Sequence, residues 1–206
     1  QEGPKNVLTS RTRLRLYVHV GRTVSLRSDH ELMEASLDGD LAAFDELMQR
    51  YERLVYRVAI HLVHHSESAF DVTQTVFLKA FEGLARFRHE SNVKTWLLRI
   101  TYNECIDCLR RHRSQGENHD PLEEASAHLA AEAVQEREAL RREDRLRLAR
   151  ALADLNERYR LAVVLRYFQG LSIAEIASVL GCSEGVTKNM LFRSVRSLRE
   201  SLAETV

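Results

Sequence analysis

The stretch LSIAEIASVLGCSEGVTKNMLFRSVRSLR, residues 171–199, decides the fold of the C-terminal part of the chain. Ser172 and Glu175 have the spacing of a capping box, which opens a short helix. Gly181 supplies the backbone freedom for a tight turn, and Ser183 is placed to cap a longer helix. A short helix, a turn with glycine and a longer helix form the helix-turn-helix pattern. The two helices are predicted at residues 173–180 and 184–200.

The second predicted helix carries polar and basic residues on one face. Such a face suits insertion into a DNA major groove, where arginines reach phosphates and the N-terminal half reaches base edges. The alternative is a helical hairpin whose basic face is only solvated. The face comprises Lys188, Asn189, Phe192, Arg193, Arg196 and Arg199. The residues expected to pack inside are Ile173, Ile176, Ala177, Leu180, Val186, Leu191, Val195 and Leu198.

A second informative stretch, SESAFDVTQTVFLKAF, occupies residues 66–81. On a helix with 3.6 residues per turn, its apolar residues form one stripe. Such a helix packs one face into a core and offers the other to water or to a partner. The stripe consists of Ala69, Val72, Val76, Phe77 and Ala80. The opposite face is expected to carry Ser68, Asp71, Gln74, Thr75 and Lys79.

Helical periodicity extends over most of the remaining chain. Asp40 is placed to cap a long amphipathic helix that ends at residues 64–66. A further helix is predicted at residues 95–113. In the C-terminal part, the apolar segment 159–168 is predicted to be a helix that Gly170 ends. With 2 prolines and 8 glycines in 206 residues, the composition also favours helices over sheets, so we expect an all-α fold.

The net charge is zero, with 30 basic and 30 acidic residues, but charge is segregated along the chain. Residues 1–28 are basic and are interpreted as a mobile tail, with a short strand over residues 13–20 as the alternative. Residues 114–140 are rich in acids and begin with turn residues, which is typical of a linker. The chain is therefore predicted to hold two small helical domains, at residues 29–113 and 141–206, joined by a flexible acidic linker.

A second basic element surrounds the predicted helix at residues 95–113. Single-stranded nucleic acid is bound by cationic grooves that carry aromatic platforms for unstacked bases. Trp96 and Tyr102 would supply the platforms, although a tryptophan at helical spacing is more often a core residue. The basic residues are Lys94, Arg99, Arg110, Arg111 and Arg113.

No motif for a cofactor, a metal or catalysis stands out in the sequence. Cys105 and Cys108 lie three residues apart, but no second pair completes a zinc site. His61, His64 and His65 lack a carboxylate at ligand spacing. Without a glycine-rich phosphate loop, a nucleophile elbow or an HExxH sequence, we do not expect an enzyme. Three cysteines without a secretory signal, and no long apolar run, favour a cytoplasmic protein.

From residue 29 to residue 200, the sequence resembles the extracytoplasmic-function (ECF) sigma factors, promoter-specificity subunits of bacterial RNA polymerase. Residues 44–62 are similar to the first long helix of the family's second region. WLLRITYNECIDCLRR, residues 96–111, is close to the family's promoter-melting helix. Residues 172–199 are similar to the family's C-terminal helix-turn-helix.

This resemblance implies a role in transcription initiation without catalytic activity. The implied partners are promoter DNA and the clamp helices of the largest subunit of RNA polymerase, and an anti-sigma factor stays open. The acidic linker would lie in the positively charged RNA-exit path. The residues implied at the minus-ten element are Arg88, Asn92, Trp96, Arg99, Asn103, Arg110 and Arg111. Those implied at the minus-thirty-five element are Lys188, Asn189, Phe192, Arg193 and Arg196.

The sequence departs from the family most clearly at residues 66–81. Family members typically have an acidic face there that pairs with the clamp, whereas residues 68–75 of this chain keep only Asp71 as an acid. Our hypothesis is that a serine/threonine kinase restores the charge, with Thr75 as the first candidate and Thr73 as the second. The alternative is that Phe70 and its neighbours make a less ionic contact. The residues implied at the polymerase are Ser68, Asp71, Gln74 and Thr75.

Two other classes of protein fit parts of the pattern. One is a transcriptional regulator that binds duplex DNA through the helix-turn-helix without polymerase. The other is an adaptor that uses its helical hairpins only to bind proteins. Copurification with core RNA polymerase separates the first class from a sigma factor, and DNA binding separates the second. Met190 stands where the family often has arginine, so the resemblance does not imply a promoter sequence.

Overall fold

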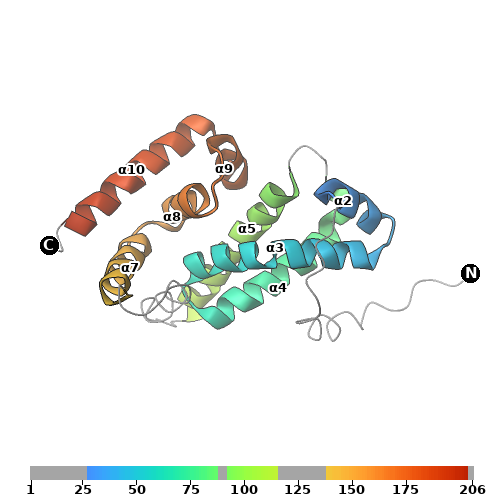
Figure 1. Cartoon of the computed structure of the whole chain (residues 1–206), viewed down its shortest axis with the longest axis horizontal. Helices are drawn as coiled ribbons and strands as arrows, with labels where there is room; N and C mark the ends of the chain where they lie inside the picture. Colours follow the sequence, from blue (N-terminus) through green and yellow to red (C-terminus); the bar gives the residue numbers. More distant parts are fainter. Residues whose placement is uncertain (1–26, 88–91, 116–137, 204–206) are drawn as a thin grey trace, which may run out of the picture.

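The computed structural model describes residues 27–87, 92–115 and 138–203, and within these ranges the regular elements are helices (Figure 1). The all-α prediction is confirmed for this part of the chain. The predicted tail up to residue 26, the strand proposed within it, most of the acidic linker and Arg88 lie outside the described residues. In chain order the elements are α2 (Asp29–Leu37), α3 (Leu41–Val63), α4 (Ser66–Gly83), the 3₁₀ turn η2 (Leu84–Arg86), α5 (Val93–Gln115), α7 (Glu138–Ala153), α8 (Glu157–Val163), the π-helical turn η3 (Val164–Phe168), α9 (Ile173–Leu180) and α10 (Glu184–Ala203).

The N-terminal half consists of α2 to α5, with α3 and α4 side by side against α5 (Figure 1). α3 begins after Asp40, whose carboxylate accepts hydrogen bonds from the N–H groups of Ala42 and Ala43 at 3.0 and 3.2 Å. It ends at His64, which adopts the left-handed conformation with φ 58°. Both ends agree with the sequence prediction. In α4 the whole predicted stripe is buried, at Ala69, Val72, Val76, Phe77 and Ala80.

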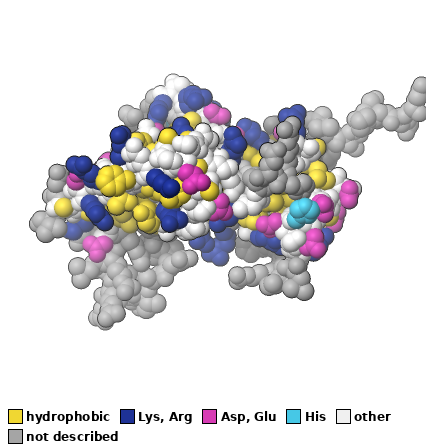
Figure 2. Space-filling view, turned by 90° about the horizontal axis from the view of Figure 1, so that it is seen from above, with side chains coloured by type: hydrophobic (Ala, Val, Ile, Leu, Met, Phe, Trp, Pro, Cys, Tyr) yellow, Lys and Arg dark blue, Asp and Glu magenta, His cyan; other side chains and the backbone are white. Residues whose placement is uncertain are grey.

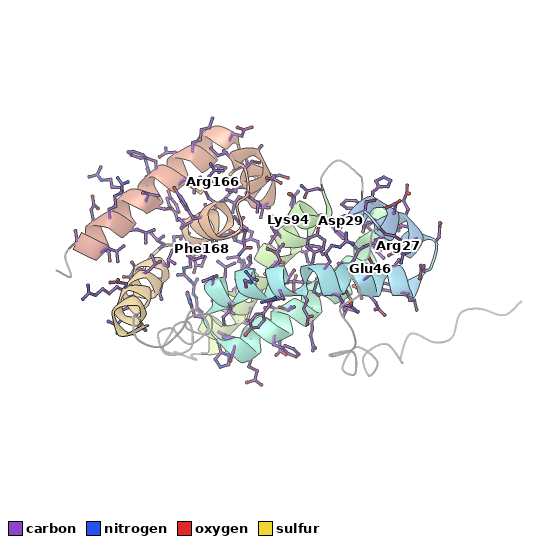
Figure 3. All side chains as sticks on the ribbon, in the orientation of Figure 1. Arg27, Asp29, Glu46, Lys94, Arg166 and Phe168 are labelled. Carbon is purple, nitrogen blue, oxygen red and sulfur yellow. The ribbon has the colours of Figure 1, made fainter. Side chains whose placement is uncertain are left out.

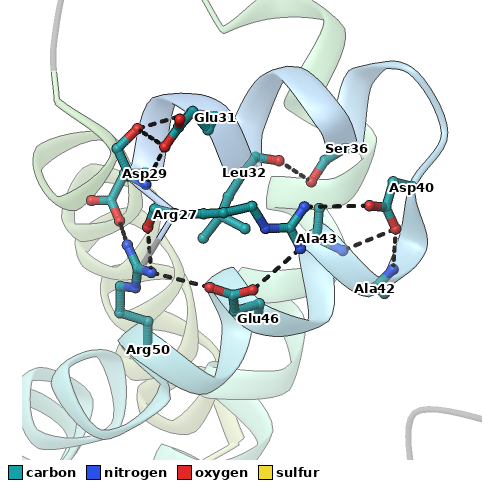
Figure 4. Close-up of polar contacts among 11 residues, drawn as sticks. Arg27, Asp29, Glu31, Leu32, Ser36, Asp40, Ala42, Ala43, Glu46 and Arg50 are labelled. Carbon is teal, nitrogen blue, oxygen red and sulfur yellow. Dashed lines mark hydrogen bonds and ion pairs between the residues drawn. The ribbon is translucent and has the colours of Figure 1, made fainter. Parts of the chain in front are cut away.

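A network of charged side chains joins α2 to the start of α3 (Figure 4). The Ser28 side chain caps α2 and forms a capping box with Glu31. The Arg27 guanidinium lies 3.6 Å from the carboxylate of Asp40 and 3.3 Å from that of Glu46. Arg27 and Ser28 were expected at the end of the mobile tail. They instead belong to the helical body, because both are held by contacts with α2 and α3.

The helix-turn-helix forms as the sequence predicts. Ser172 and Glu175 make both bonds of the capping box, with Ser172 N–H donating to the Glu175 carboxylate at 2.8 Å. α9 ends at Gly181, whose φ of 61° lies in the left-handed region that favours glycine. The bounds of the first helix are confirmed to the residue, and α10 continues past the predicted end to Ala203.

The apolar segment before the helix-turn-helix differs from the prediction of one continuous helix. α8 ends at Val163, and the π-helical turn η3 follows it. A π-helical turn changes the angular position of the side chains after it. Leu165 is therefore fully buried, whereas Tyr167 is 63% exposed. Arg166, within this turn, donates a hydrogen bond from Nη1 to the carbonyl oxygen of Leu171, which follows the turn, at 2.9 Å.

The two halves pack against each other, with α5 against α9 and α3 against α8. Buried apolar residues from both halves form one continuous cluster. At this junction, where Figure 3 labels Lys94 and Phe168, the Lys94 ammonium donates to the carbonyl oxygen of Gln169 at 3.3 Å. The rings of His61 and Phe168 lie 5.2 Å apart between centroids. The two predicted domains therefore share a core in this structure, in addition to the chain that connects them.

Candidate nucleic-acid and polymerase interfaces

The outer face of α10 carries the residues predicted to read duplex DNA. Its most exposed large apolar side chain is Phe192, at 70%. Figure 2 shows hydrophobic side chains surrounded by lysines and arginines over the end of the molecule that holds α10. Arg196 Nε donates to Glu200 at 2.8 Å, and this bond raises the pKa of the guanidinium, which stays charged. The exposed predicted residues are Lys188, Asn189, Phe192, Arg193 and Arg196.

The inner face of α10 corrects one packing prediction. Val186 was expected inside but is 49% exposed, and the neighbouring Thr187 is fully buried in its place. The Thr187 hydroxyl is satisfied there, because it donates to the Ser183 carbonyl oxygen at 3.1 Å and lies 3.3 Å from Cys182 Sγ. Met190 is also buried and therefore does not belong to the face offered to DNA.

A cavity of about 640 Å³ lies along α5 beside the C-terminal end of α4. Trp96 lines it and is half-buried, with its ring centroid 5.0 Å from that of Phe87. Gly83 also lines the cavity beside this indole, and a Cβ there would make an ordinary contact with Trp96 Cζ2 at 3.4 Å. Trp96 thus packs on the core and also lines the cavity. The polar and charged lining includes Lys79, Arg86, Asn103, Glu104, Asp107 and Arg110.

The other residues predicted at the minus-ten element lie at different places along α5. Asn92 caps the helix, with its Oδ1 accepting from Thr95 N–H at 2.7 Å, and its Nδ2 donates to Glu175 in α9 at 3.2 Å. Arg99 is exposed on the helix surface. Near the C-terminal end, Asp107 accepts hydrogen bonds from two arginines. These are Arg110, through the carboxylate at 3.2 Å, and Arg111, through the backbone carbonyl at 3.4 Å.

The outer face of α4 carries three of the four residues predicted at the polymerase. Asp71 is exposed, and Gln74 and Thr75 are partly exposed. The Thr75 hydroxyl donates to the backbone carbonyl of Asp71 at 2.9 Å. The expected exposure of Ser68 is wrong, because it is 8% exposed with its hydroxyl 3.0 Å from His65 Nδ1. α5 packs over this side of α4 and covers the position.

Sequence reasoning missed two charged groups that organise these surfaces. Glu104, 6% exposed on α5, forms an ion pair with Lys79 of α4 at the edge of the cavity. Arg160, also 6% exposed, donates to the carbonyl oxygens of Leu152 and Leu155 at 2.8 and 2.9 Å and to that of Leu62 at 3.2 Å. Lys79 and Glu104 are 25 residues apart in the sequence, so no local pattern indicated the first pair. The available signal for Arg160 was its place in an otherwise apolar segment, residues 159–168, which holds one other arginine, Arg166.

Of the histidines and cysteines named in the sequence, Cys105 and Cys108 are buried, and His61, His64 and His65 are partly buried. Burial, together with the nearby Arg160 guanidinium, lowers the pKa of His61 to about 4 and that of His64 to about 3. Burial raises the pKa of the Cys105 thiol. Within the part of the chain that the structure describes, no three His, Cys, Asp or Glu side chains are grouped to hold a metal ion. Nor is any helix there long and apolar enough to cross a membrane.

These features define a class of protein, a helical DNA-binding protein with a helix-turn-helix in one half and an aromatic, charged cavity in the other. Two family comparisons agree with this division. Sigma-70 region 2 matches residues 47–115, and Sigma-70 region 4 matches residues 145–198.

Relatives and solved structures resemble most of the chain. It is 38% identical to the ECF RNA polymerase sigma factor SigM of Mycobacterium tuberculosis over 168 residues, covering 82% of this chain and 81% of that protein. It is 32% identical to the RNA polymerase sigma-H factor of Pseudomonas aeruginosa over 180 residues, covering 84% of this chain and 93% of that protein. RpoE of Bartonella quintana, solved with the anti-sigma factor NepR, matches with a TM-score of 0.63 and 25% identity. The match covers 78% of this chain and 96% of that one. CnrH, solved with the cytosolic domain of CnrY, has the same fold, with a TM-score of 0.67 and 24% identity over 86% of this chain and 99% of that one.

The chain belongs to the ECF family of RNA polymerase sigma factors. It directs RNA polymerase to promoters, and it binds both promoter DNA and the core enzyme. This membership decides against a regulator that acts without polymerase and against a pure protein adaptor.

Proposed function

We propose that the three surfaces described above divide the work of promoter recognition. The exposed face of α10 reads the minus-thirty-five element, with Lys188, Asn189, Phe192, Arg193 and Arg196. The cavity along α5 takes an unstacked base of the minus-ten element, which fits its combination of an indole and cationic side chains. The outer face of α4 binds the clamp helices of the polymerase.

We further propose that the clamp contact is controlled by phosphorylation of Thr75. Its side chain is partly exposed on the outer face of α4, so a kinase and then the clamp have access to it. Thr73 is 5% exposed, and its hydroxyl donates to the carbonyl oxygen of Ala69 at 2.7 Å. Adding a phosphate to Thr73 would place about two negative charges in the core, which disfavours it as the modified residue.

The charges around Thr75 bear on how a phosphate would act. Asp71 and Lys79 lie one helical turn before and after it, so a phosphate meets one repulsive and one attractive neighbour. Lys79 already pairs with Glu104, and the phosphate would compete for that ammonium. The two local effects oppose each other, which leaves most of the added charge for the basic clamp. One charged hydrogen bond is worth about 1.5–3 kcal/mol, or about 10- to 150-fold in affinity.

Run-off transcription with core RNA polymerase tests this proposal directly. Thr75→Glu and kinase-treated protein are expected to transcribe at least about tenfold more than the untreated protein at limiting concentration. Kinase-treated Thr75→Ala should stay at the untreated level. Thr73→Val is the matched control, and it should still respond to the kinase. Equal activity of treated Thr75→Ala and treated wild type would refute the choice of Thr75.

An anti-sigma protein is a further candidate partner. RpoE of Bartonella quintana forms a complex with the anti-sigma factor NepR, and this chain is similar to RpoE over 78% of its length. Pull-down with the folded chain, followed by loss of transcription on addition of the captured protein, would identify such a partner. A captured protein that leaves transcription unchanged would not belong to the anti-sigma class.

A further inference from the structure

The cavity along α5 has two unlike walls. One wall is formed by α4 and η2 and presents Lys79, Gly83 and Arg86. The other wall is α5, which presents the indole of Trp96 and the amide of Asn103. A nucleotide also has two unlike parts, an anionic phosphate and a flat base that stacks on aromatic rings. The two walls therefore suit a nucleotide whose phosphate lies towards α4 and η2 and whose base lies towards α5.

Most of the charges that line this cavity are already paired. Glu104 forms an ion pair with Lys79, and the Arg110 guanidinium lies 3.2 Å from the Asp107 carboxylate. Arg86 is exposed and makes no hydrogen bond or ion pair with the rest of the described chain. The lining thus carries one positive charge in excess, at Arg86, and an anion can bind there without breaking an existing contact.

Arg86 lies at the same end of the cavity as the indole. The next residue in the chain, Phe87, packs its ring on that of Trp96, with centroids 5.0 Å apart. A base stacked on the free part of this indole would have its own phosphate within the reach of an arginine side chain at position 86. The unpaired charge and the aromatic platform can therefore serve one nucleotide.

Lys79 is the second cation of this wall. Its side chain is 48% exposed although it pairs with Glu104. An ammonium has three N–H donors, so one carboxylate leaves donors for a phosphate. Glu104 is 6% exposed on α5 and holds this ammonium at the edge of the cavity. Gly83, between Lys79 and Arg86, has no side chain to separate the two cations.

We propose that Arg86 and Lys79 bind two backbone phosphates of the single-stranded minus-ten element. Arg86 binds the phosphate next to the base on Trp96, and Lys79 binds a phosphate further along α4. Neither residue was among those expected at this element. Backbone contacts of this kind fix the register and orientation of a strand without reading its bases. The inference rests on the proposed role of the cavity in taking an unstacked base.

Neutral methylphosphonate linkages, placed one at a time in single-stranded non-template DNA, test the contact of Arg86 in the holoenzyme. One linkage should weaken binding by wild type about three- to tenfold. Arg86→Met should weaken binding of the natural strand by the same factor and lose no more than about twofold further at that linkage. If Arg86→Met lost as much as wild type at every linkage, the assignment of Arg86 would be wrong.

The contact of Lys79 needs a double variant. Lys79→Met alone leaves the nearly buried Glu104 carboxylate without its partner, which destabilises the fold. K79M/E104Q removes both charges, and Glu104→Gln alone is its reference. The double variant should lose its response to a second linkage, whose position relative to the first gives the direction of the strand. A response as large as that of Glu104→Gln at every linkage would remove Lys79 from the phosphate path.

The salt dependence of binding is an independent measure. Each phosphate contact to a single strand contributes about 0.7 to the slope of log affinity against log salt concentration. Arg86→Met should therefore lower the slope by about 0.7 on every sequence. Arg53→Met is the matched control, because Arg53 is exposed on α3 and does not line the cavity. It should keep the wild-type slope, and the same slope in Arg86→Met would refute the phosphate contact.

Abasic sites separate this inference from the proposed function. An abasic site at the captured base should weaken binding by wild type and by Arg86→Met, but not by Trp96→Ala. If an abasic site weakens binding and no methylphosphonate does, the phosphate path is refuted and base capture stands. If the response to one methylphosphonate depends on Arg86 and no abasic site has an effect, base capture is refuted and the phosphate contact stands.

Discussion

Replacing Arg160 with methionine is the most direct test of how the junction is held. Arg160 is 6% exposed, and burial lowers the pKa of its guanidinium. Arginine stays charged in proteins, so the substitution removes a charged group. Methionine keeps the apolar stem but takes a donor away from four carbonyl oxygens. They belong to Leu152, Ala153, Leu155 and Leu62, with bonds of 2.8, 2.6, 2.9 and 3.2 Å. Of the four, that of Leu152 still accepts a hydrogen bond from the Leu155 N–H at 3.2 Å.

The expected loss follows from the other three groups, the carbonyl oxygens of Ala153, Leu155 and Leu62. An unsatisfied buried carbonyl costs about 1 kcal/mol at the lower end of the usual range, so three of them cost about 3 kcal/mol. Removing one partner of a buried charged contact typically costs about 3–5 kcal/mol, which agrees with this value. Such a loss is about a third to a half of the free energy of unfolding of a typical domain. Arg160→Lys keeps the charge but not the fork of donors, and about half the loss is expected.

Equilibrium urea unfolding at pH 7.5, followed by circular dichroism, measures the free energy of unfolding. Arg158→Met is the matched control, because Arg158 Nη2 makes a single bond, to the Leu180 carbonyl oxygen at 2.8 Å. It should cost only about 1 kcal/mol. If Arg160→Met cost no more than this control, the carbonyl groups would not depend on Arg160, and the reasoning about the junction would be wrong.

Two further predictions concern stability. The pKa values of His61 and His64 are lowered to about 4 and about 3, so the unfolded chain binds more protons than the folded chain below pH 6.5. The free energy of unfolding should therefore fall as the pH falls from about 6.5 towards 4. The expected slope is about 1.4 kcal/mol per pH unit for each histidine. Asparagine tolerates the left-handed backbone of His64, so His64→Asn should fold and reduce that slope. Urea unfolding at pH 7, 6 and 5 measures the slope. An unchanged slope would exclude His64 as a source of the pH dependence. Gly181→Ala should lower the free energy of unfolding by about 1–2 kcal/mol through backbone strain alone, since a Cβ would meet nothing within 4 Å. Gly185→Ala, inside α10 with ordinary φ, should instead raise it by up to about 1 kcal/mol, and a similar thermal shift for both variants would contradict this account.

Local signals predicted the elements well where each was set by neighbours in sequence. The bounds of α9 followed from Ser172, Glu175 and Gly181, which act within one turn of the helix they limit. The start of α3 followed from Asp40 in the same way. Such capping interactions are independent of tertiary packing, which explains why the sequence was sufficient.

The errors arose where another element decides what a residue contacts. Helical spacing placed Ser68 on an outer face, but α5 lies across that part of α4 and covers it. Helical spacing also predicted that Val186, and not Thr187, is buried. The pattern of apolar residues contains no information on the hydrogen-bonding partners, Ser183 and Cys182, that satisfy the buried threonine hydroxyl. The packing of one half on the other was not predicted, since an apolar stripe shows that a face is buried without identifying its partner.

The capping of α5 by Asn92 has a consequence for the order of events at a promoter. The residue that begins this helix is occupied by the other half, while α10 is exposed to solvent. On the proposed assignment of α10 to the minus-thirty-five element, a chain in this state would bind intact duplex and leave it paired. Recognition of sequence would come first and strand separation second, with the polymerase supplying the step between them.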